Sequence, residues 1–230
     1  MGRKKKNPDY DADRVFKEYA DCVAAFYLAE DIAGQNVSLR SAADEFDTTI
    51  LKIRKVLITA GVFQSETSER VQLLYEEGKT IFEIQTELQL SRASVYSYLP
   101  YVKTIYNANE ISANAERLQN YRKRKKIVND FKSSLRDGCP SGDIIWETVS
   151  AFAGYPFYTC KGMKFYYIVH GNEMIVDRKK KTITRATVYL FVQKVLSLQS
   201  EGKCVTGPKK VGTFGASYLF PMFKRFGLIL

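Results

Sequence analysis

Histidine and cysteine are scarce in this 230-residue sequence, which limits the metal chemistry that it supports. The one histidine is His170, and the cysteines at Cys22, Cys139, Cys160 and Cys204 include no C-x-x-C pair. Zinc fingers need clustered Cys and His ligands at short spacings, so the sequence predicts no metal site. We expect the cysteines to be free thiols in a reducing compartment.

Long apolar runs are also missing. No stretch approaches the roughly 18 apolar residues that a membrane span needs. The amino-terminal stretch MGRKKKNPDYDADR is charged and lacks the apolar core of a signal peptide. Lys6 stands where a myristoylation site has Ser or Thr. We therefore expect a cytoplasmic protein with no membrane partner.

Acidic residues are in the minority. The chain has 35 Lys and Arg against 25 Asp and Glu, a net charge of +10 and a pI near 9.3. A hydrophobic share of 45% and an aromatic share of 13% exclude a disordered chain. A basic globular protein commonly binds a polyanion, and nucleic acid is the commonest one. The simpler alternative is ordinary solubility charge.

The pattern of apolar residues predicts two parts of different fold class. Residues 1–8 form a basic tail, and residues 9–106 have apolar positions at spacings of three and four with almost no proline, which predicts a helical domain. A basic helix over residues 107–138 connects it to residues 139–230. There, aromatic and β-branched residues alternate with polar ones, which predicts a small α+β domain.

Residues 69–101 contain two short helical patterns joined by a turn, which is typical of a helix-turn-helix. Thr80 is placed to cap the helix IFEIQTEL, and Glu83 lies three residues on to complete a capping box. Ser91 is placed to cap the next helix, RASVYSYL. The residues expected to face the core are Val71, Leu74, Tyr75, Ile81, Ile84, Leu88, Leu90, Val95 and Leu99.

This arrangement leaves the start of the second helix outside the core. In a helix-turn-helix the second helix enters the major groove, where Arg reads guanine, Ser donates to bases or phosphates, and Ala meets a thymine methyl. The sequence therefore predicts binding of double-stranded DNA through Ser91, Arg92, Ala93, Ser94, Tyr96 and Ser97. The alternative is an ordinary helical hairpin.

The pattern L-x3-G-K-T-I-x-E-I-x3-L-x-L-S-R-A-S-V-Y-x-Y-L resembles the helix-turn-helix that ends the resolvase and invertase recombinases and recurs in many bacterial regulators. The resemblance covers about 30 residues. It implies that Thr80 caps the positioning helix and that the recognition helix carries Ser91, Arg92, Ser94 and Tyr96. Gln85-Thr86 departs from the family, which usually has alanine there. The catalytic serine domain is not evident, so the resemblance implies no recombinase activity.

Residues 38–60 show a second helix-turn-helix pattern. Ser38 is placed to cap LRSAADEF, and Ala42 and Ala43 are small enough for a close helix crossing. The following helix is expected to present Lys52, Arg54 and Lys55 on its charged side. The candidate DNA contacts here are Thr48, Thr49 and Lys52. The alternative is that this unit only packs against the other.

Basic clusters elsewhere are candidate phosphate contacts. They are Arg122, Arg124 and Lys125 on the connecting helix, Lys180 and Arg185 at a strand end and helix start, and Lys209 and Lys210 in a glycine-rich loop. Neither a G-x-x-x-x-G-K-[ST] nor a G-x-G-x-x-G fingerprint is present, so we expect no cofactor. The alternative for each cluster is a solvated surface.

In the carboxy-terminal domain, HGN between two strand-like runs predicts a β-hairpin. Thr184 is placed to cap a helix that ends near Gly202, and Pro221 is expected to interrupt the last helix.

Strand alternation in this domain puts Phe165 and Tyr167 on one face and Tyr166 and Ile168 on the other. We expect helices to cover one face, and a partner subunit or the amino-terminal domain to cover the other. A homodimer would also place two helix-turn-helix units on paired half-sites.

Catalytic candidates are few. Asp177-x-Lys179, with Glu173 or Asp143 as a second carboxylate, has the form of a short nuclease signature, and His170 is expected in a turn. The sequence therefore favours a non-enzymatic, sequence-specific DNA-binding protein, a nucleoid-associated transcriptional regulator or mobile-element accessory factor. The alternatives are a DNA-cleaving or DNA-modifying enzyme and a protein-interaction scaffold.

Overall fold

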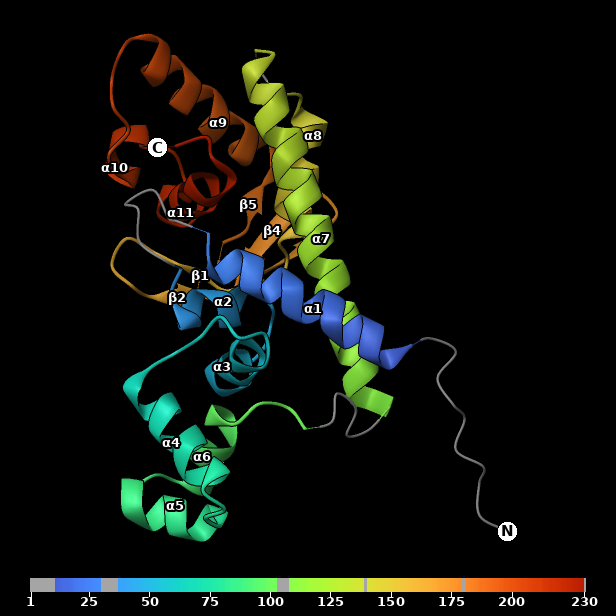
Figure 1. Cartoon of the computed structure of the whole chain (residues 1–230). Coiled ribbons are helices and arrows are strands. Elements are labelled where there is room, and N and C mark those ends of the chain that lie inside the picture. Colours follow the sequence, from blue (N-terminus) through green and yellow to red (C-terminus); the bar gives the residue numbers. More distant parts are fainter. Residues whose placement is uncertain (1–10, 30–36, 103–107, 139, 179–180, 230) are drawn as a thin grey trace. The chain divides into compact units, whose positions relative to one another are not determined.

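The structure is a computed structural model that describes residues 11–29, 37–102, 108–138, 140–178 and 181–229. The chain forms two compact units, unit 1 (Met1–Tyr121) and unit 2 (Arg122–Leu230). The division falls inside α7 (Ala108–Arg136), the long helix predicted between the two domains (Figure 1). The predicted fold class is confirmed, with helices in the amino-terminal half and small antiparallel sheets in the carboxy-terminal half. The predicted tail 1–8 lies outside the described residues.

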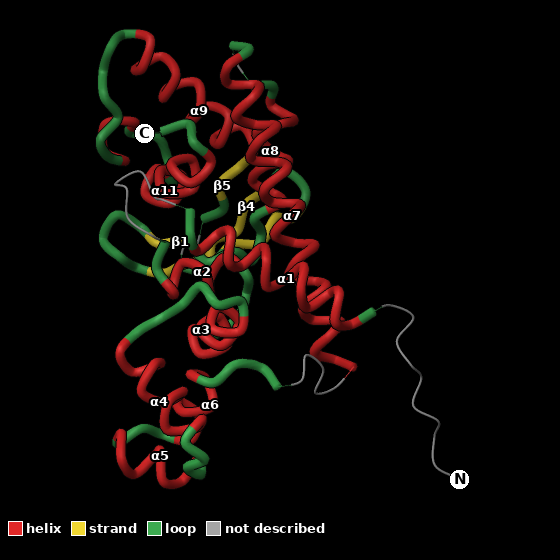
Figure 2. Tube along the Cα trace, viewed as in Figure 1, coloured by secondary structure: helices red, strands yellow, loops and turns green. Residues whose placement is uncertain are grey.

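Unit 1 is helical throughout its described part, apart from turns and loops (Figure 2). Its helices before α7 are α1 (Ala12–Tyr27), α2 (Leu39–Glu45), α3 (Ile50–Thr59), α4 (Glu66–Glu76), α5 (Ile81–Leu88) and α6 (Arg92–Tyr98). One apolar cluster joins α1, α2, α3 and the first part of α7 around Phe46, which lies between Tyr19 and Tyr121. A second cluster joins α4, α5 and α6. Each predicted helix-turn-helix segment therefore contributes to its own core.

Unit 2 surrounds a third apolar cluster. Its helices are α8 (Gly142–Ala151), α9 (Arg185–Ser200), α10 (Pro208–Val211) and α11 (Ala216–Phe226). Its strands are β1 (Phe157–Tyr158), β2 (Lys164–Phe165), β3 (Tyr167–His170), β4 (Glu173–Val176) and β5 (Ile183–Thr184). Strands β1 and β2 pair with each other, while β3, β4 and β5 form an antiparallel sheet in that order. The second part of α7 contributes Val128 and Phe131 to this core.

The predicted hairpin is confirmed as β3 and β4. His170 pairs with Glu173, so Gly171 and Asn172 form a two-residue turn, with Gly171 at a φ of 58°. A positive φ at the first turn residue favours glycine. The indole of Trp146 donates to the carbonyl of Gly171 at 3.2 Å, which ties the turn to α8.

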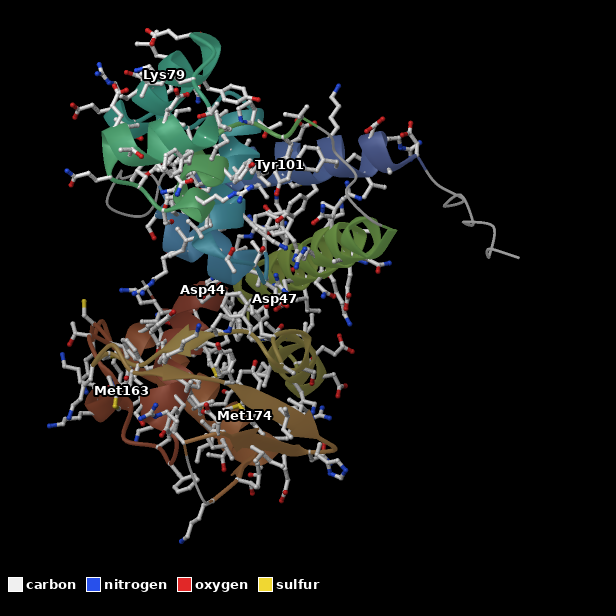
Figure 3. All side chains as sticks on the ribbon, turned by 90° about the horizontal axis from the view of Figure 1, so that it is seen from below. Asp44, Asp47, Lys79, Tyr101, Met163 and Met174 are labelled. Carbon is white, nitrogen blue, oxygen red and sulfur yellow. The ribbon has the colours of Figure 1, made fainter. Side chains whose placement is uncertain are left out.

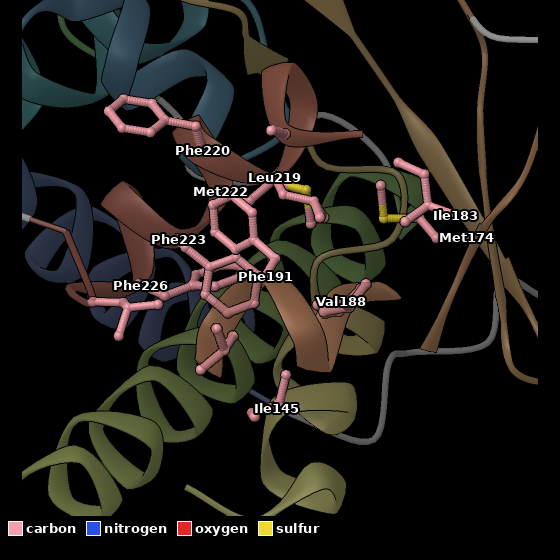
Figure 4. Packing of buried hydrophobic residues seen from close by; sticks show 14 of the residues in the cluster. Ile145, Met174, Ile183, Val188, Phe191, Leu219, Phe220, Met222, Phe223 and Phe226 are labelled. Atoms are coloured by element: carbon pink, nitrogen blue, oxygen red, sulfur yellow. The ribbon is translucent and has the colours of Figure 1, made fainter. Parts of the chain in front are cut away.

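Helix α11 continues through Pro221, so the predicted interruption was wrong. Proline removes one helical hydrogen bond, but the apolar face of the helix is buried on both sides of it. Leu219, Phe223 and Phe226 pack against Phe191 of α9 and neighbouring side chains in the core (Figure 4). Burial of this face outweighs the loss of one backbone bond.

The two faces of the strand region around β3 differ as predicted. Phe165 and Tyr167 are buried, and the Tyr167 hydroxyl donates to the Val149 carbonyl at 2.6 Å. On the opposite face, Ile168 is 60% exposed and lies opposite Ile175 of β4. The described residues cover one face only.

Candidate nucleic-acid interface

Helices α4, α5 and α6 form a compact group whose boundaries are set by side-chain caps (Figure 1). The Thr80 hydroxyl accepts from the Glu83 amide at 3.3 Å, and the Glu83 carboxylate accepts from the Thr80 amide at 2.7 Å. The predicted capping box is thus confirmed. The Thr80 hydroxyl also donates to this carboxylate at 2.7 Å, and the hydrogen bonds that the carboxylate accepts, first from the Thr80 amide and then from the Thr80 hydroxyl, lower the pKa of Glu83 below its ordinary value.

The turn between α5 and α6 is short and sharp. Gln89 adopts the left-handed conformation at a φ of 51°, and the Leu90 amide then donates to the Gln85 carbonyl at 3.1 Å. The Ser91 hydroxyl accepts from the Ser94 amide at 3.1 Å and caps α6 as predicted. The direction of α6 is therefore fixed at its first residue.

The core beneath these helices follows the predicted spacing with one exception. Val71, Leu74, Ile84, Val95 and Leu99 are buried, with Ile81, Leu88 and Leu90 packed around them. The prediction was wrong for Tyr75, which is 47% exposed. Successive helix positions diverge by about 100° because an α-helix has 3.6 residues per turn. With Val71 and Leu74 facing this small core, position 75 lies beyond its edge.

The first residues of α6 are open to solvent. Arg92, Ala93 and Tyr96 are exposed, and Ser94 is half-buried. The Cζ atom of Arg92 lies 5.7 Å from the centroid of the Tyr96 ring, one turn further along the helix. Guanidinium and phenol thus form one exposed surface at this end of α6.

Ser97 is placed differently from its prediction as an exposed contact. It is only 4% exposed, donates to the Ser94 carbonyl at 2.7 Å and accepts from the guanidinium of Arg54. Because its hydroxyl is engaged within the protein, Ser97 holds α6 to α3.

The first helix-turn-helix segment begins at its predicted cap, Ser38. The Ser38 hydroxyl accepts from the Ser41 amide, and Ala42 and Ala43 are buried. Thr49 caps α3 by accepting from the Lys52 amide at 3.3 Å, while Thr48 is half-buried in the preceding turn. Of the candidate contacts here, Thr49 and Lys52 are the exposed ones.

Arg54 and Lys55 do not form a solvated charged side of α3, which corrects that expectation. The guanidinium of Arg54 lies over the Tyr98 ring, and the Lys55 ammonium lies 4.8 Å from the ring centroid of Tyr101, labelled in Figure 3. Burial lowers the pKa of Lys55. The Thr59 hydroxyl also accepts from the Tyr101 amide at 3.0 Å. The second helices of the two segments are therefore joined to each other.

Charge is divided unequally between the two units. Unit 1 contains 15 Lys and Arg against 18 Asp and Glu, a net charge of −3. Unit 2 contains 20 against 7, a net charge of +13. On α5, Glu87 pairs with both Arg70 and Lys79, so its single charge offsets one of these two cations. The positive charge of the whole chain thus resides in unit 2.

The basic candidates on α7 lie in unit 2. Arg122 and Lys125 are exposed. Arg124 is half-buried, and its Cζ atom lies 5.3 Å from the Tyr155 ring centroid and 5.9 Å from that of Phe152. Arg225, from α11, approaches the same Phe152 ring at 6.0 Å. Sequence reasoning missed Arg225, because nothing in its spacing links it to a residue some hundred positions earlier.

The remaining candidates are dispersed over unit 2. Arg185 is half-buried and forms an ion pair with Asp143. Lys209 and Lys210 are exposed on α10, and Lys210 donates to the Cys204 carbonyl at 3.2 Å. Lys180 lies outside the described residues. Lys164, which sequence reasoning did not select, lies on β2 with its ammonium 5.2 Å from the Tyr166 ring centroid.

Comparison with known proteins adds no relative. No protein-family model, curated protein or solved structure matches the chain.

Over the described ranges, no three His, Cys, Asp or Glu side chains come together as a possible metal site. Asp177, the candidate nuclease carboxylate, accepts from the Tyr166 amide at 3.1 Å. No described helix combines the length and the apolar character needed to cross a bilayer.

Proposed function

We propose that the protein binds double-stranded DNA at a preferred sequence, as a transcriptional regulator or as an accessory factor of a mobile element. The observation that carries the proposal is the exposed start of α6. Arg92, Ala93 and Tyr96 project from a helix whose cap, turn and opposite face are all held in place. Arginine and alanine are side chains that read guanine and the thymine methyl in the major groove. The resemblance to the resolvase and invertase helix-turn-helix supports the same assignment.

The charge distribution supports different roles for the two units in DNA binding. A unit with a net charge of −3 does not attract phosphates by its overall charge, so α6 by itself provides selectivity more than affinity. Unit 2, at +13, supplies the phosphate contacts, with exposed Arg122 and Lys125 on α7 as the leading candidates. The sequence predicted basic DNA contacts on both α6 and α7. The charge of each unit is what assigns selectivity to α6 and phosphate binding to α7.

The proposal includes a homodimer acting on the nucleoid. Two copies would bring two α6 helices to paired half-sites. The exposed face of β3 and β4, with Ile168 and Ile175, is the apolar surface on which we place the second copy.

Selection of bound molecules from a random pool of double-stranded DNA tests this function. We expect enrichment of one motif by the full chain, and binding whose logarithm falls linearly with the logarithm of the salt concentration. If the recovered DNA showed no enriched motif, the proposal of sequence-specific binding would be wrong. The enzyme alternative is tested in the same samples, since Mg²⁺-dependent nicking that Asp177→Ala abolishes would replace our proposal.

A further inference from the structure

Unit 2 contains a pocket of about 790 Å³ between the β1–β2 turn and the segment from Thr206 to Tyr218. A pocket of this size lies within the range of small-molecule sites. Its walls are largely apolar and include Met163, Pro208, Ala216 and Tyr218. An apolar group of one or two rings that bound here would displace water and bury apolar surface against these walls.

Three lysines line the same pocket. Lys161 comes from the β1–β2 turn, and Lys209 and Lys210 come from α10. All three residues are exposed, and the Lys210 ammonium donates to the Cys204 carbonyl at 3.2 Å. Among the described residues that line the pocket there is no Asp or Glu. The opening therefore favours an anion, while the interior favours an apolar group.

Two polar features lie in the segment that forms one wall of the pocket. The Thr213 hydroxyl is shielded from solvent and has no hydrogen-bond partner among the described residues. Buried polar groups are nearly always paired, so this hydroxyl is an unsatisfied group within the wall of the pocket, with almost no surface open to the pocket itself. Helix α11 begins nearby at Gly215 without a side-chain cap, and its Ala216 amide donates to the Thr213 carbonyl at 3.2 Å.

The wall formed by α11 is held closely against β5. Gly215 has a φ of 76°, and a Cβ atom there would lie 2.5 Å from Cδ1 of Ile183. Glycine is therefore required both by the backbone conformation and by the packing. The pocket is formed by fixed elements of the fold and does not need a ligand to create it.

We propose that this pocket binds a small organic anion, a molecule with an apolar body and a phosphate or carboxylate group. The apolar body would contact Met163 and Tyr218, and the anionic group would meet Lys209 and Lys210. A DNA backbone offers phosphates and sugars but no apolar body to fill the interior, so the pocket differs from the phosphate contacts proposed above. The inference concerns unit 2 alone and stands whether or not the chain binds DNA.

Fluorescence titration of the full chain with two probes tests the proposal. N-methylanthraniloyl-AMP offers a phosphate, and cis-parinaric acid offers a carboxylate. We expect at least one to bind, and the double variant Lys209→Ala, Lys210→Ala to weaken that binding roughly tenfold or more, as expected for lost charge-assisted hydrogen bonds. Ser217→Phe, which places a ring in the pocket, should weaken it as well.

The matched control is the double variant Lys203→Ala, Lys224→Ala, which removes the same charge from exposed lysines outside the pocket. It should leave probe binding unchanged. The proposal is overturned if neither probe binds, or if the control weakens binding as much as the pocket variant does. Should Ser217→Phe fail to fold, the two lysine pairs still decide the outcome. Preference for one probe identifies the anionic group.

Discussion

The guanidinium of Arg54 lies over the ring of Tyr98, with Cζ 3.6 Å from the ring centroid, and donates to the hydroxyl of Ser97. Arg54 belongs to α3, whereas Ser97 and Tyr98 belong to α6, so one side chain joins the second helices of both helix-turn-helix segments. The Nε atom of Arg54 is buried and has no hydrogen-bond partner among the described residues. The face of the Tyr98 ring therefore offsets much of the cost of partly burying the Arg54 charge.

Replacement of Arg54 by alanine should destabilise unit 1. The variant loses the ring contact and leaves the buried Ser97 hydroxyl without this donor, at a cost of about 1–3 kcal/mol. Urea unfolding followed by far-ultraviolet circular dichroism measures the change, while fluorescence of Trp146 reports unit 2. Lys52→Ala, at an exposed position of the same helix, is the control and should change little. Equal unfolding midpoints for the two variants would contradict the role of Arg54.

The capping box of α5 should make the stability of unit 1 depend on pH. Hydrogen bonds from the Thr80 backbone and hydroxyl lower the pKa of Glu83 in the folded protein. A lowered folded pKa means that the stabilisation is fully present above the ordinary value of 4.5 and is lost as the pH falls through the folded value. Glu83→Gln keeps a capping group that does not titrate.

The wild type should therefore lose more stability than Glu83→Gln when the pH is lowered from neutral to about 3. The comparison uses urea midpoints from circular dichroism at each pH, with the Trp146 transition as the internal control, because Trp146 lies in unit 2. Parallel pH profiles for the two proteins would show that this carboxylate does not contribute through its charge.

Local signals in the sequence determine much of the fold. The caps at Ser38, Thr49, Thr80, Ser91 and Thr184 were all predictable, because a cap depends on residues within one turn of it. The hairpin turn is equally local.

The contacts between distant segments were not predictable. Helical spacing places Arg54 on a polar side of α3, but it contains no information that Tyr98 will cover that side. The same limit explains the burial of Ser97 and the convergence of Arg124 and Arg225 on Phe152. The sequence therefore identified the segment that forms the candidate interface. The side chains that fix this segment in place could be identified only from the structure.

Replacement of Arg92 by alanine should reduce sequence preference more than overall affinity. If Arg92 reads a base, its loss costs about 1–3 kcal/mol on the selected site and little on unrelated DNA. Fluorescence anisotropy with labelled duplexes of both kinds measures the ratio. Arg70→Ala removes the same charge from α4, where Arg70 pairs with Glu87, and should preserve the ratio. A preference that survives Arg92→Ala would assign the reading of bases to another residue.

Gly215 should be far less tolerant of alanine than Gly162, although both have a φ of 76°. At Gly162 an added Cβ meets nothing within 4 Å, so alanine there carries only the strain of the backbone conformation. At Gly215 the same atom would lie 2.5 Å from Cδ1 and 3.0 Å from Cγ1 of the buried Ile183, so either this side chain or α11 itself must shift. Overpacking of this kind adds about 1–3 kcal/mol to the backbone strain.

Urea unfolding followed by Trp146 fluorescence should show this extra loss for Gly215→Ala. Ile183→Val, which removes the Cδ1 atom, should recover part of it in the double variant. Equal losses for the two glycine variants would mean that the backbone conformation, and not the contact with Ile183, is what requires glycine at position 215.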